Sequence, residues 1–200
     1  MVPDTIDDRW TKGSARKDYR IMYENGYKRL QDSLIDVIAE EQAKLGYMKE
    51  PIRLYYPLSS LNHFFESEGD AEAMQESLGG FPEATKEIFG EVQVSHKGDR
   101  FCFFLSEHAT EYVHEHRDEN AFIFALVQLL TKHGTTLDEV KELFRSQTSE
   151  CAMKPMDNGE FDLMIRFVDS EDPYYYCFKD EGCHIIYHRF LPEDYADFEF

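Results

Sequence analysis

The sequence predicts an α+β protein in which a long N-terminal helix and shorter helices accompany an antiparallel β-sheet with an inserted αα-hairpin. Three observations predict this class: helical periodicity near the start, period-two alternation of apolar residues near the end, and no regular strand–helix alternation between them. The 200 residues contain no fixed-period repeat and no long low-complexity linker. We therefore expect a single domain over residues 1–200, with residues 1–17 as a candidate flexible N-terminus.

A long amphipathic helix is predicted over residues 18–45. Apolar and aromatic side chains recur there every three or four positions, as they do on one face of a helix: Tyr19, Met22, Tyr23, Tyr27, Leu30, Leu34, Val37, Ile38 and Leu45. Gly46 and Pro51 then favour the end of the helix. A glycine inside a helix costs about 1 kcal/mol relative to alanine, so we expect another element to pack closely at Gly26.

Short elements follow this helix. Residues 52–56 predict a short strand, which Pro57 ends. A serine can then cap a short helix whose apolar face is formed by Leu61, Phe64 and Phe65. Weaker helical patterns cover residues 71–78 and 82–89, and glycines stop both of them.

The pattern then changes from helical to extended. Residues 91–95 alternate apolar and polar side chains, residues 100–105 are rich in Phe, and residues 96–99 between them have the composition of a turn. This combination predicts a β-hairpin. Residues 109–116 either extend the sheet or turn away from it.

The second half begins with two predicted helices and ends with strands. Residues 120–132 are apolar nearly all round, which predicts a buried helix. Thr136 and Glu139 form a capping-box pattern that opens a second helix through Phe144, so the pair forms an αα-hairpin. An antiparallel meander is then predicted from residues 161–167, 174–178 and 183–190.

The charge balance excludes some partners. Forty acids against 21 bases give a net charge of −19. Such a chain repels nucleic acid, whose binding depends on Lys and Arg displacing counterions, and it repels anionic membranes. The two helices around Gly134 could form a helix-turn-helix, but the second helix carries Asp138, Glu139 and Glu142. We expect no nucleic-acid partner and no membrane partner, and keep an acidic mimic of nucleic-acid charge as a further alternative.

The cysteines indicate the cellular compartment. Four occur, at positions 102, 151, 177 and 183, and no two of them form a Cys-x-x-Cys pair. No stretch approaches the roughly 20 apolar residues that span a bilayer, and the first ten residues contain no apolar segment typical of a signal peptide. We therefore expect a cytoplasmic protein with reduced thiols.

Common catalytic motifs are absent, and one histidine cluster is the main candidate for chemistry. The sequence has no Gly-x-Gly-x-x-Gly, no phosphate-binding loop, no Gly-x-Ser-x-Gly and no His-Glu-x-x-His. On a strand, His114 and His116 would point to the same side about 7 Å apart and could bind one metal ion, completed by Glu111 or His108. The alternative is a set of surface or structural histidines. We expect no cofactor.

Two further groups of residues have weaker functional interpretations. His184 and His188 share a strand face, but about 13 Å separates them, so they need another group to bind a metal. The run at residues 174–176 is three tyrosines, which either pack a sheet or line a cleft for a small ligand together with Tyr55, Tyr56 and Phe64.

Several local patterns resemble a known family. They are residues 112–115 (Tyr-Val-His-Glu), the capped helix over residues 136–144, and residues 176–178 (Tyr-Cys-Phe) with the strand region over residues 182–190. These patterns resemble a family of uncharacterised proteins from Firmicutes of the Clostridia type, known as a domain of unknown function. The resemblance implies a bacterial, cytoplasmic, stand-alone domain over most of the chain after the first helix. It implies no activity, cofactor or catalytic residue.

The leading functional prediction is a non-catalytic domain that binds a protein or small-molecule partner. The alternative is a metal-dependent hydrolase that uses His114 and His116. A separate prediction concerns the acidic, aromatic residues 192–200. We expect Tyr195 and Phe198 to dock on the domain, with the nearby acids directed toward the bases of residues 9–20.

Overall fold

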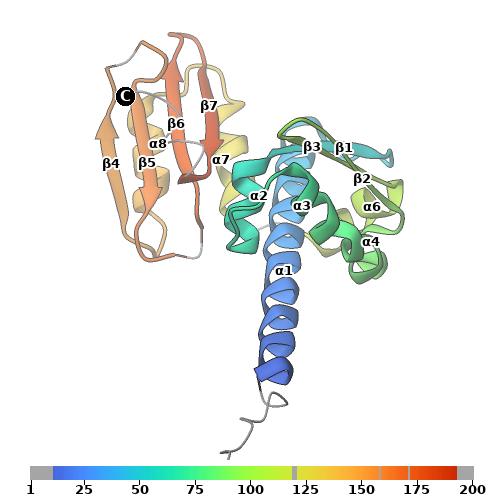
Figure 1. Cartoon of the computed structure of the whole chain (residues 1–200). Coiled ribbons are helices and arrows are strands. Elements are labelled where there is room, and N and C mark those ends of the chain that lie inside the picture. Colours follow the sequence, from blue (N-terminus) through green and yellow to red (C-terminus); the bar gives the residue numbers. More distant parts are fainter. Residues whose placement is uncertain (1–10, 119–120, 158, 171, 193–200) are drawn as a thin grey trace, which may run out of the picture. The chain divides into compact units, whose positions relative to one another are not determined.

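The computed structural model describes residues 11–118, 121–157, 159–170 and 172–192, with side chains from residue 25 onward. It confirms the α+β class, because helices are combined with two antiparallel β-sheets (Figure 1). The predicted docking of residues 192–200 depends on Tyr195 and Phe198, which lie outside the described residues, and so stays a prediction.

The chain divides into two compact units. Unit 1 comprises Met1–Val37 and Lys49–Tyr112, and unit 2 comprises Ile38–Met48 and Val113–Phe200. The single domain expected over residues 1–200 stays a prediction, because two compact units that share helices can unfold together or separately. Most of residues 1–17, the candidate flexible N-terminus, also lie outside the described residues.

Helix α1 spans Thr11–Leu45 and contributes to both units. Leu30 and Leu34 are fully buried, because residues four apart lie on one face of a helix. After the last helical residue, the amide of Gly46 donates to the carbonyl of Gln42 at 2.9 Å, and Gly46 has a φ of +83°. Glycine adopts this left-handed conformation without the steric cost of a side chain, so it ends the helix cleanly.

The close packing expected at Gly26 is observed. A Cβ atom added to Gly26 would lie 2.7 Å from Cδ1 of Phe65, which is closer than two carbon atoms can approach. Phe65 is 3% exposed, so its ring is held by its neighbours and has little room to move. The glycine therefore lets α1 approach the ring of Phe65 directly.

Unit 1 contains a three-stranded antiparallel sheet in the order β1-β3-β2. Its strands are β1 (Ile52–Pro57), β2 (Val92–Lys97) and β3 (Arg100–Leu105). Strands β2 and β3 form a hairpin that turns at Gly98, whose φ is +56°. One face of the sheet is buried, with side chains that include Leu54, Tyr56, Phe101, Phe103 and Leu105.

Short helices complete unit 1, and the last of them continues into unit 2. They are α2 (Leu58–Phe65), α3 (Ala71–Ser77), the 3₁₀ helix η1 (Leu78–Gly80), α4 (Phe81–Ala84), α5 (Lys86–Phe89) and α6 (Glu107–His116). Their buried side chains include Leu61, Phe64, Met74, Phe81 and Phe89. Of the two alternatives for residues 109–116, turning away from the sheet is the one observed. Ala109 and Val113 are both buried in α6, as residues four apart on one helical face can be.

Unit 2 combines a pair of helices with a four-stranded antiparallel meander. The helices are α7 (Phe122–Leu130) and α8 (Leu137–Arg145). The strands run in the order β4-β5-β6-β7 and are β4 (Cys151–Pro155), β5 (Leu163–Phe167), β6 (Tyr175–Asp180) and β7 (Ile185–Phe190). The expected capping box is present, because the hydroxyl of Thr136 accepts from the Glu139 amide and the Glu139 carboxylate accepts from the Thr136 amide.

Aromatic side chains fill the core of unit 2 between the helix pair and one face of its sheet. The Phe144 ring lies 5.2 Å from the Tyr176 ring, edge to face, and also contacts Phe167 and Phe178. The opposite face is partly buried as well, because Met164 and Cys177 pack with Met156 and Phe161 from the loop before β5. Both faces of this sheet therefore contribute to packing.

All four cysteines are free thiols. Cys177 is fully buried, and burial raises the pKa of its thiol to about 12, so it is protonated and unreactive at neutral pH. Among the described residues, we find no helix with the length and apolar character that a membrane crossing requires.

Candidate functional site

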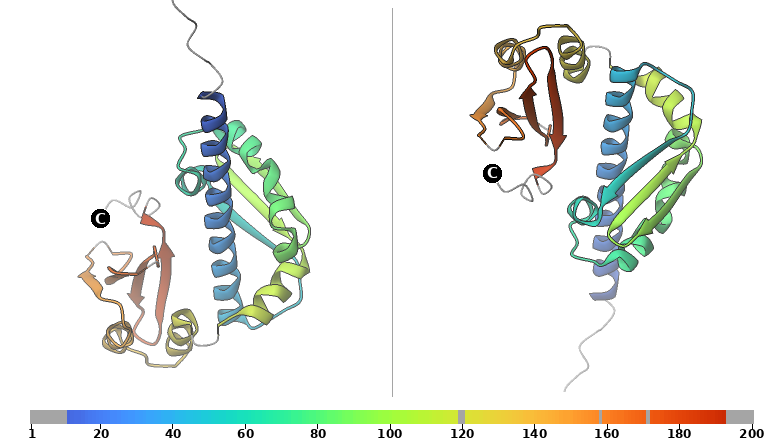
Figure 2. Two further views of the ribbon diagram at one scale, coloured as in Figure 1. Left: turned by 90° about the horizontal axis from the view of Figure 1, so that it is seen from below. Right: turned by 90° about the horizontal axis from the view of Figure 1, so that it is seen from above.

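One face of the β1-β3-β2 sheet is left uncovered by the helices of unit 1. In the right-hand view of Figure 2, the three strands lie nearer the viewer than α1, which packs behind them. Successive side chains of a strand point to opposite faces, so the residues between the buried ones share the uncovered side. We call this side the open face; its strand residues are Arg53, Tyr55, Pro57, Gln93, Ser95, Lys97, Arg100, Cys102 and Phe104.

The strand register arranges these side chains in rows. In the row at one end of β3, Phe104 pairs with Arg53 of β1. In the row at the other end of β3, Arg100 pairs with Lys97 of β2. Tyr55, which is 52% exposed, lies in the row between them, opposite Cys102. Arg53 and Arg100 are thus four residues apart along the strand direction and one strand apart across it, which places their Cα atoms about 14 Å from each other.

The open face is basic, although the chain as a whole is strongly acidic. Arg53, Lys97 and Arg100 are exposed, and the strand residues of this face include no acid. Among the described residues, no carboxylate forms an ion pair with any of these three bases. Bases on the helices are mostly held by carboxylates: Lys28 by Asp32, Arg29 by Glu66, Lys86 by Glu83, Lys141 by Asp138 and Arg145 by Glu142. The nearest acids in sequence, Glu50 and Asp99, lie just beyond the ends of the strands.

Each arginine of the open face rests on an aromatic ring. The guanidinium carbon of Arg53 is 4.9 Å from the centroid of the Phe104 ring, and that of Arg100 is 4.6 Å from the centroid of the Tyr55 ring. A guanidinium on a ring is attracted by the electrons of the ring and keeps its N–H groups for other partners. Planar, paired N–H donors match the two oxygens of a carboxylate. The open face can therefore bind anionic groups at two positions that the aromatic rings hold in place.

The sequence predicts only part of this surface. Tyr55 is predicted to line a ligand cleft, whereas local patterns predict no role for Arg53, Lys97, Arg100 and Phe104. The signal that could have found them is the strand alternation, since the buried positions of each strand fix which residues share the other side. Tyr56 and Phe64, expected beside Tyr55, are buried in the core of unit 1.

The residues predicted to bind a metal lie on helix α6, so the strand geometry assumed for them is wrong. A helix turns about 100° per residue, which directs His114 and His116 to different sides of the axis. Lys49 donates to the Glu111 carboxylate at 2.6 Å, and this hydrogen bond is the main reason that the pKa of Glu111 is lowered. The His114 ring stacks on Tyr47, with 3.9 Å between the ring centroids and 4° between the ring planes.

The other histidines considered as metal ligands, His108, His184 and His188, have separate local partners. His108 contacts the Glu87 carbonyl at 3.1 Å, and His184 contacts the thiol of Cys183 at 3.1 Å. His188 lies beside Phe161, with 5.8 Å between the ring centroids. No group of three or more His, Cys, Asp or Glu side chains in the described parts of the chain could hold a metal ion. The metal site at Glu111, His114 and His116 stays a prediction, and the geometry adds no support to it.

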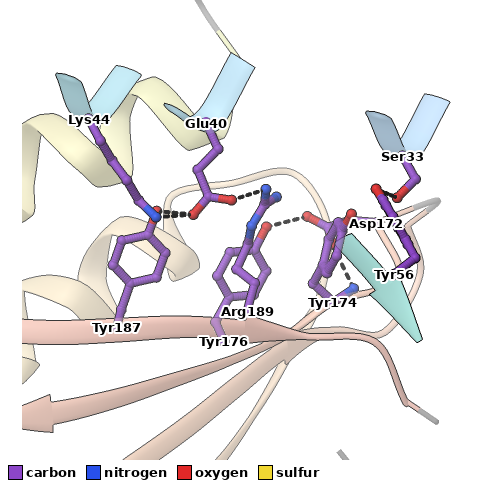
Figure 3. A network of polar contacts seen from close by, with 9 residues as sticks. All are labelled: Ser33, Glu40, Lys44, Tyr56, Asp172, Tyr174, Tyr176, Tyr187 and Arg189. Carbon is purple, nitrogen blue, oxygen red and sulfur yellow. Dashed lines mark hydrogen bonds and ion pairs between the residues drawn. The ribbon is translucent and has the colours of Figure 1, made fainter. Parts of the chain in front are cut away.

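A second polar cluster, within unit 2, joins the last turns of α1 to β7 (Figure 3). Glu40 accepts from Arg189 through one carboxylate oxygen, and from Tyr187 at 2.6 Å and Lys44 at 2.7 Å through the other. Arg189 also lies over the Tyr174 ring, 4.3 Å from its centroid. The Ser33–Tyr56 pair in the same figure, with 2.8 Å between the hydroxyls, belongs to unit 1.

The electrostatics of this cluster indicate a structural role. Burial raises the pKa of Glu40, but Arg189, Lys44 and Tyr187 together outweigh it, so the pKa is lowered overall. Burial, reinforced by Asp172, raises the pKa of Tyr176, whose hydroxyl donates to Asp172 at 2.7 Å. A carboxylate that is ionised at neutral pH, with both oxygens already accepting hydrogen bonds, is a poor proton acceptor. The cluster therefore holds α1 to the sheet of unit 2 and is not the candidate for ligand binding.

Comparison with known proteins identifies the family. The family described as "Domain of unknown function, E. rectale Gene description (DUF3877)" matches residues 27–198. The chain belongs to this family. The family is named after a gene of a bacterium of the Clostridia, so the resemblance predicted from the sequence is confirmed. No curated protein and no solved structure matches the chain.

Membership of DUF3877 places the chain in a family but assigns no chemistry, because the description of the family names no activity and no ligand. The matched range includes all three strands of the open face and both helices of the αα-hairpin. What this DUF3877 domain binds therefore depends on its own side chains.

Proposed function

We propose that this chain is a non-catalytic binding domain of the cytoplasm that holds acidic segments of a protein partner on its open face. The observation that carries the proposal is the set of three exposed bases that have no carboxylate partner within the described part of this chain of net charge −19. A chain with 40 acids has many carboxylates to offer these bases, yet the fold keeps them apart. The four free thiols support a reducing compartment.

The shape and the stacking of the open face favour a peptide over other anions. Small-molecule sites are usually concave and enclose the ligand, whereas a sheet face is broad and suits an extended chain. Single-stranded nucleic acid is bound by stacking of bases on exposed rings, but Arg53 and Arg100 already lie over Phe104 and Tyr55.

The proposal is tested with a fluorescein-labelled random copolymer of Glu and Tyr. We expect its fluorescence anisotropy to rise on addition of the protein at low salt, and the affinity to fall as salt is added. The variant Arg53→Glu/Arg100→Glu should bind at least about tenfold more weakly, because two attractive contacts become repulsive. A matched control, Lys132→Glu/Lys154→Glu, makes the same change in net charge on exposed residues of unit 2.

Three outcomes would contradict the proposal. The first is equal weakening in both variants, which would show that binding responds only to net charge. The second is tighter binding of a single-stranded oligothymidylate than of the copolymer, which would favour a nucleic-acid partner. The third is no binding of either polymer to the wild-type protein.

A further inference from the structure

We propose that the open face binds residues 193–200 of a second copy of this chain. This inference rests on the proposed function and deepens it by naming the acidic segment. The segment reads Glu-Asp-Tyr-Ala-Asp-Phe-Glu-Phe, so it carries four acids, three aromatic residues and no base. The open face carries three bases, two large aromatic side chains and no acid on its strands. The segment and the open face are thus opposite in charge, and both contain aromatic side chains.

The open face presents a base, an aromatic ring and a base along one diagonal. Arg53, Tyr55 and Arg100 occupy three successive rows of the sheet. The Cα atoms of the two arginines lie about 14 Å apart, with Tyr55 in the row between them. Both arginines are without a carboxylate partner among the described residues, and both rest on rings. A ligand that matched this diagonal would need two carboxylates at a similar separation.

The segment contains such a pattern. In an extended chain, alternate side chains point to the same side and recur about every 6.7 Å. Glu193 and Asp197 would therefore lie on one side about 13 Å apart, with Tyr195 between them. The two acids can thus face the two arginines, and Tyr195 can pack beside the stacked Arg100–Tyr55 pair. Phe198 and Phe200 would lie on the other side of such a strand.

The contact is reciprocal between two copies. Each copy has one open face and one such segment, so two copies related by a twofold axis make the contact twice and close the assembly. Single exposed ion pairs are weak, but the second contact within a pair of copies forms at a high effective concentration. The expected assembly is a dimer in which the segment of each copy occupies the open face of the other.

Charge reversal on the two sides tests the inference. Variant A, Arg53→Glu/Arg100→Glu, has an acidic open face and an acidic segment. Variant B, Glu193→Arg/Asp197→Arg, has a basic open face and a basic segment. By sedimentation velocity, we expect the wild type to form dimers as its concentration rises. Each variant alone should dissociate at least about tenfold more readily. An equimolar mixture should dimerise again, because both contacts between A and B join opposite charges.

The wild type and the mixture together separate this inference from its rivals. A mixture that stays monomeric would overturn the inference, because the dimer would then not depend on these charges. A contact within one copy, or docking of the segment on the bases of residues 9–20, would leave the wild type monomeric at all concentrations and would also overturn it. Binding of the Glu/Tyr copolymer through Arg53 and Arg100 under that outcome would leave the proposed function standing. Unchanged circular dichroism spectra of both variants confirm that the substitutions leave the fold intact.

Discussion

The sheets of the two units use arginine in opposite ways. In unit 2 the side chain of Arg189 is 5% exposed and is held by Glu40. In unit 1, Arg53 and Arg100 are exposed and meet aromatic rings in place of carboxylates. The sheet of unit 2 is packed on both faces, whereas the sheet of unit 1 is packed on one. Burial therefore decides whether an arginine is paired within the fold or stays exposed.

This difference has energetic consequences. A buried ion pair loses its hydration on folding, so removing one partner leaves a charge without compensation. An exposed arginine keeps its hydration whether or not a carboxylate is present, and contributes little to stability. The same substitution should thus have a large effect in unit 2 and a small effect on the open face.

The largest effect is expected from Arg189→Met. This change leaves the Glu40 carboxylate buried without its arginine, which should lower the free energy of unfolding by about 3–5 kcal/mol. Urea denaturation followed by circular dichroism measures the change. The double variant Glu40→Leu/Arg189→Met removes both charges and should recover most of the loss. A double variant less stable than Arg189→Met would contradict this account, and two separate transitions would show that the units unfold independently.

A smaller effect is expected from Gly26→Ala in unit 1. The new Cβ would overlap the ring of Phe65, so the free energy of unfolding should fall by about 1–3 kcal/mol, despite the better helix propensity of alanine. Gly79→Ala is the matched control, because nothing lies within 4 Å of the Cβ position there. Equal stability of the two variants would show that α1 is not packed against Phe65.

The pH dependence of the Glu40 cluster is a smaller effect again. Because the pKa of Glu40 is lowered on folding, its ionised form stabilises the protein above the ordinary carboxyl pKa of about 4.3. That stabilisation is lost as the pH falls through the lowered pKa. The stability difference between the wild type and Glu40→Gln should therefore narrow below about pH 4.3. A difference that stays constant from pH 6 to about pH 3 would argue against an ionised Glu40.

The smallest effect on stability is expected on the open face. Arg53→Ala and Arg100→Ala each remove an exposed contact with a ring, which should lower the free energy of unfolding by about 0.5 kcal/mol or less. The same urea denaturation measures it. A loss comparable with that of Arg189→Met would mean that these arginines have a structural role, and would weaken the case for a binding surface.

Local patterns predicted much of the fold. Thr136 and Glu139 lie three residues apart, and this spacing predicts the start of a helix. The energetic cost of a glycine inside a helix predicts the close packing at Gly26. Short-range signals of this kind need no knowledge of distant segments. Local patterns fail at the histidine cluster, because the mostly polar residues 107–116 fit either an exposed strand or an exposed helix. The burial of Ala109 and Val113, four residues apart, is what distinguishes the helix from the strand.

The candidate site could be predicted only in part, because it depends on contacts between distant segments. Arg53 and Phe104 are 51 positions apart and meet through strand pairing. Glu40 and Arg189 are 149 positions apart. Charge counts over a sequence also average the chain, so a net charge of −19 conceals a surface that is locally basic. Which bases lack carboxylates is a property of the folded molecule alone.

The division of helix α1 between two units has a consequence for synthesis of the chain on the ribosome. Residues 38–48 emerge before residues 49–112, but their unit is completed only by residues 113–200. Unit 1 can therefore close around the first part of the helix while the later turns still await their sheet. During that interval we expect Ile38, which is fully buried in the folded protein, to be exposed to water, to chaperones and to non-native contacts.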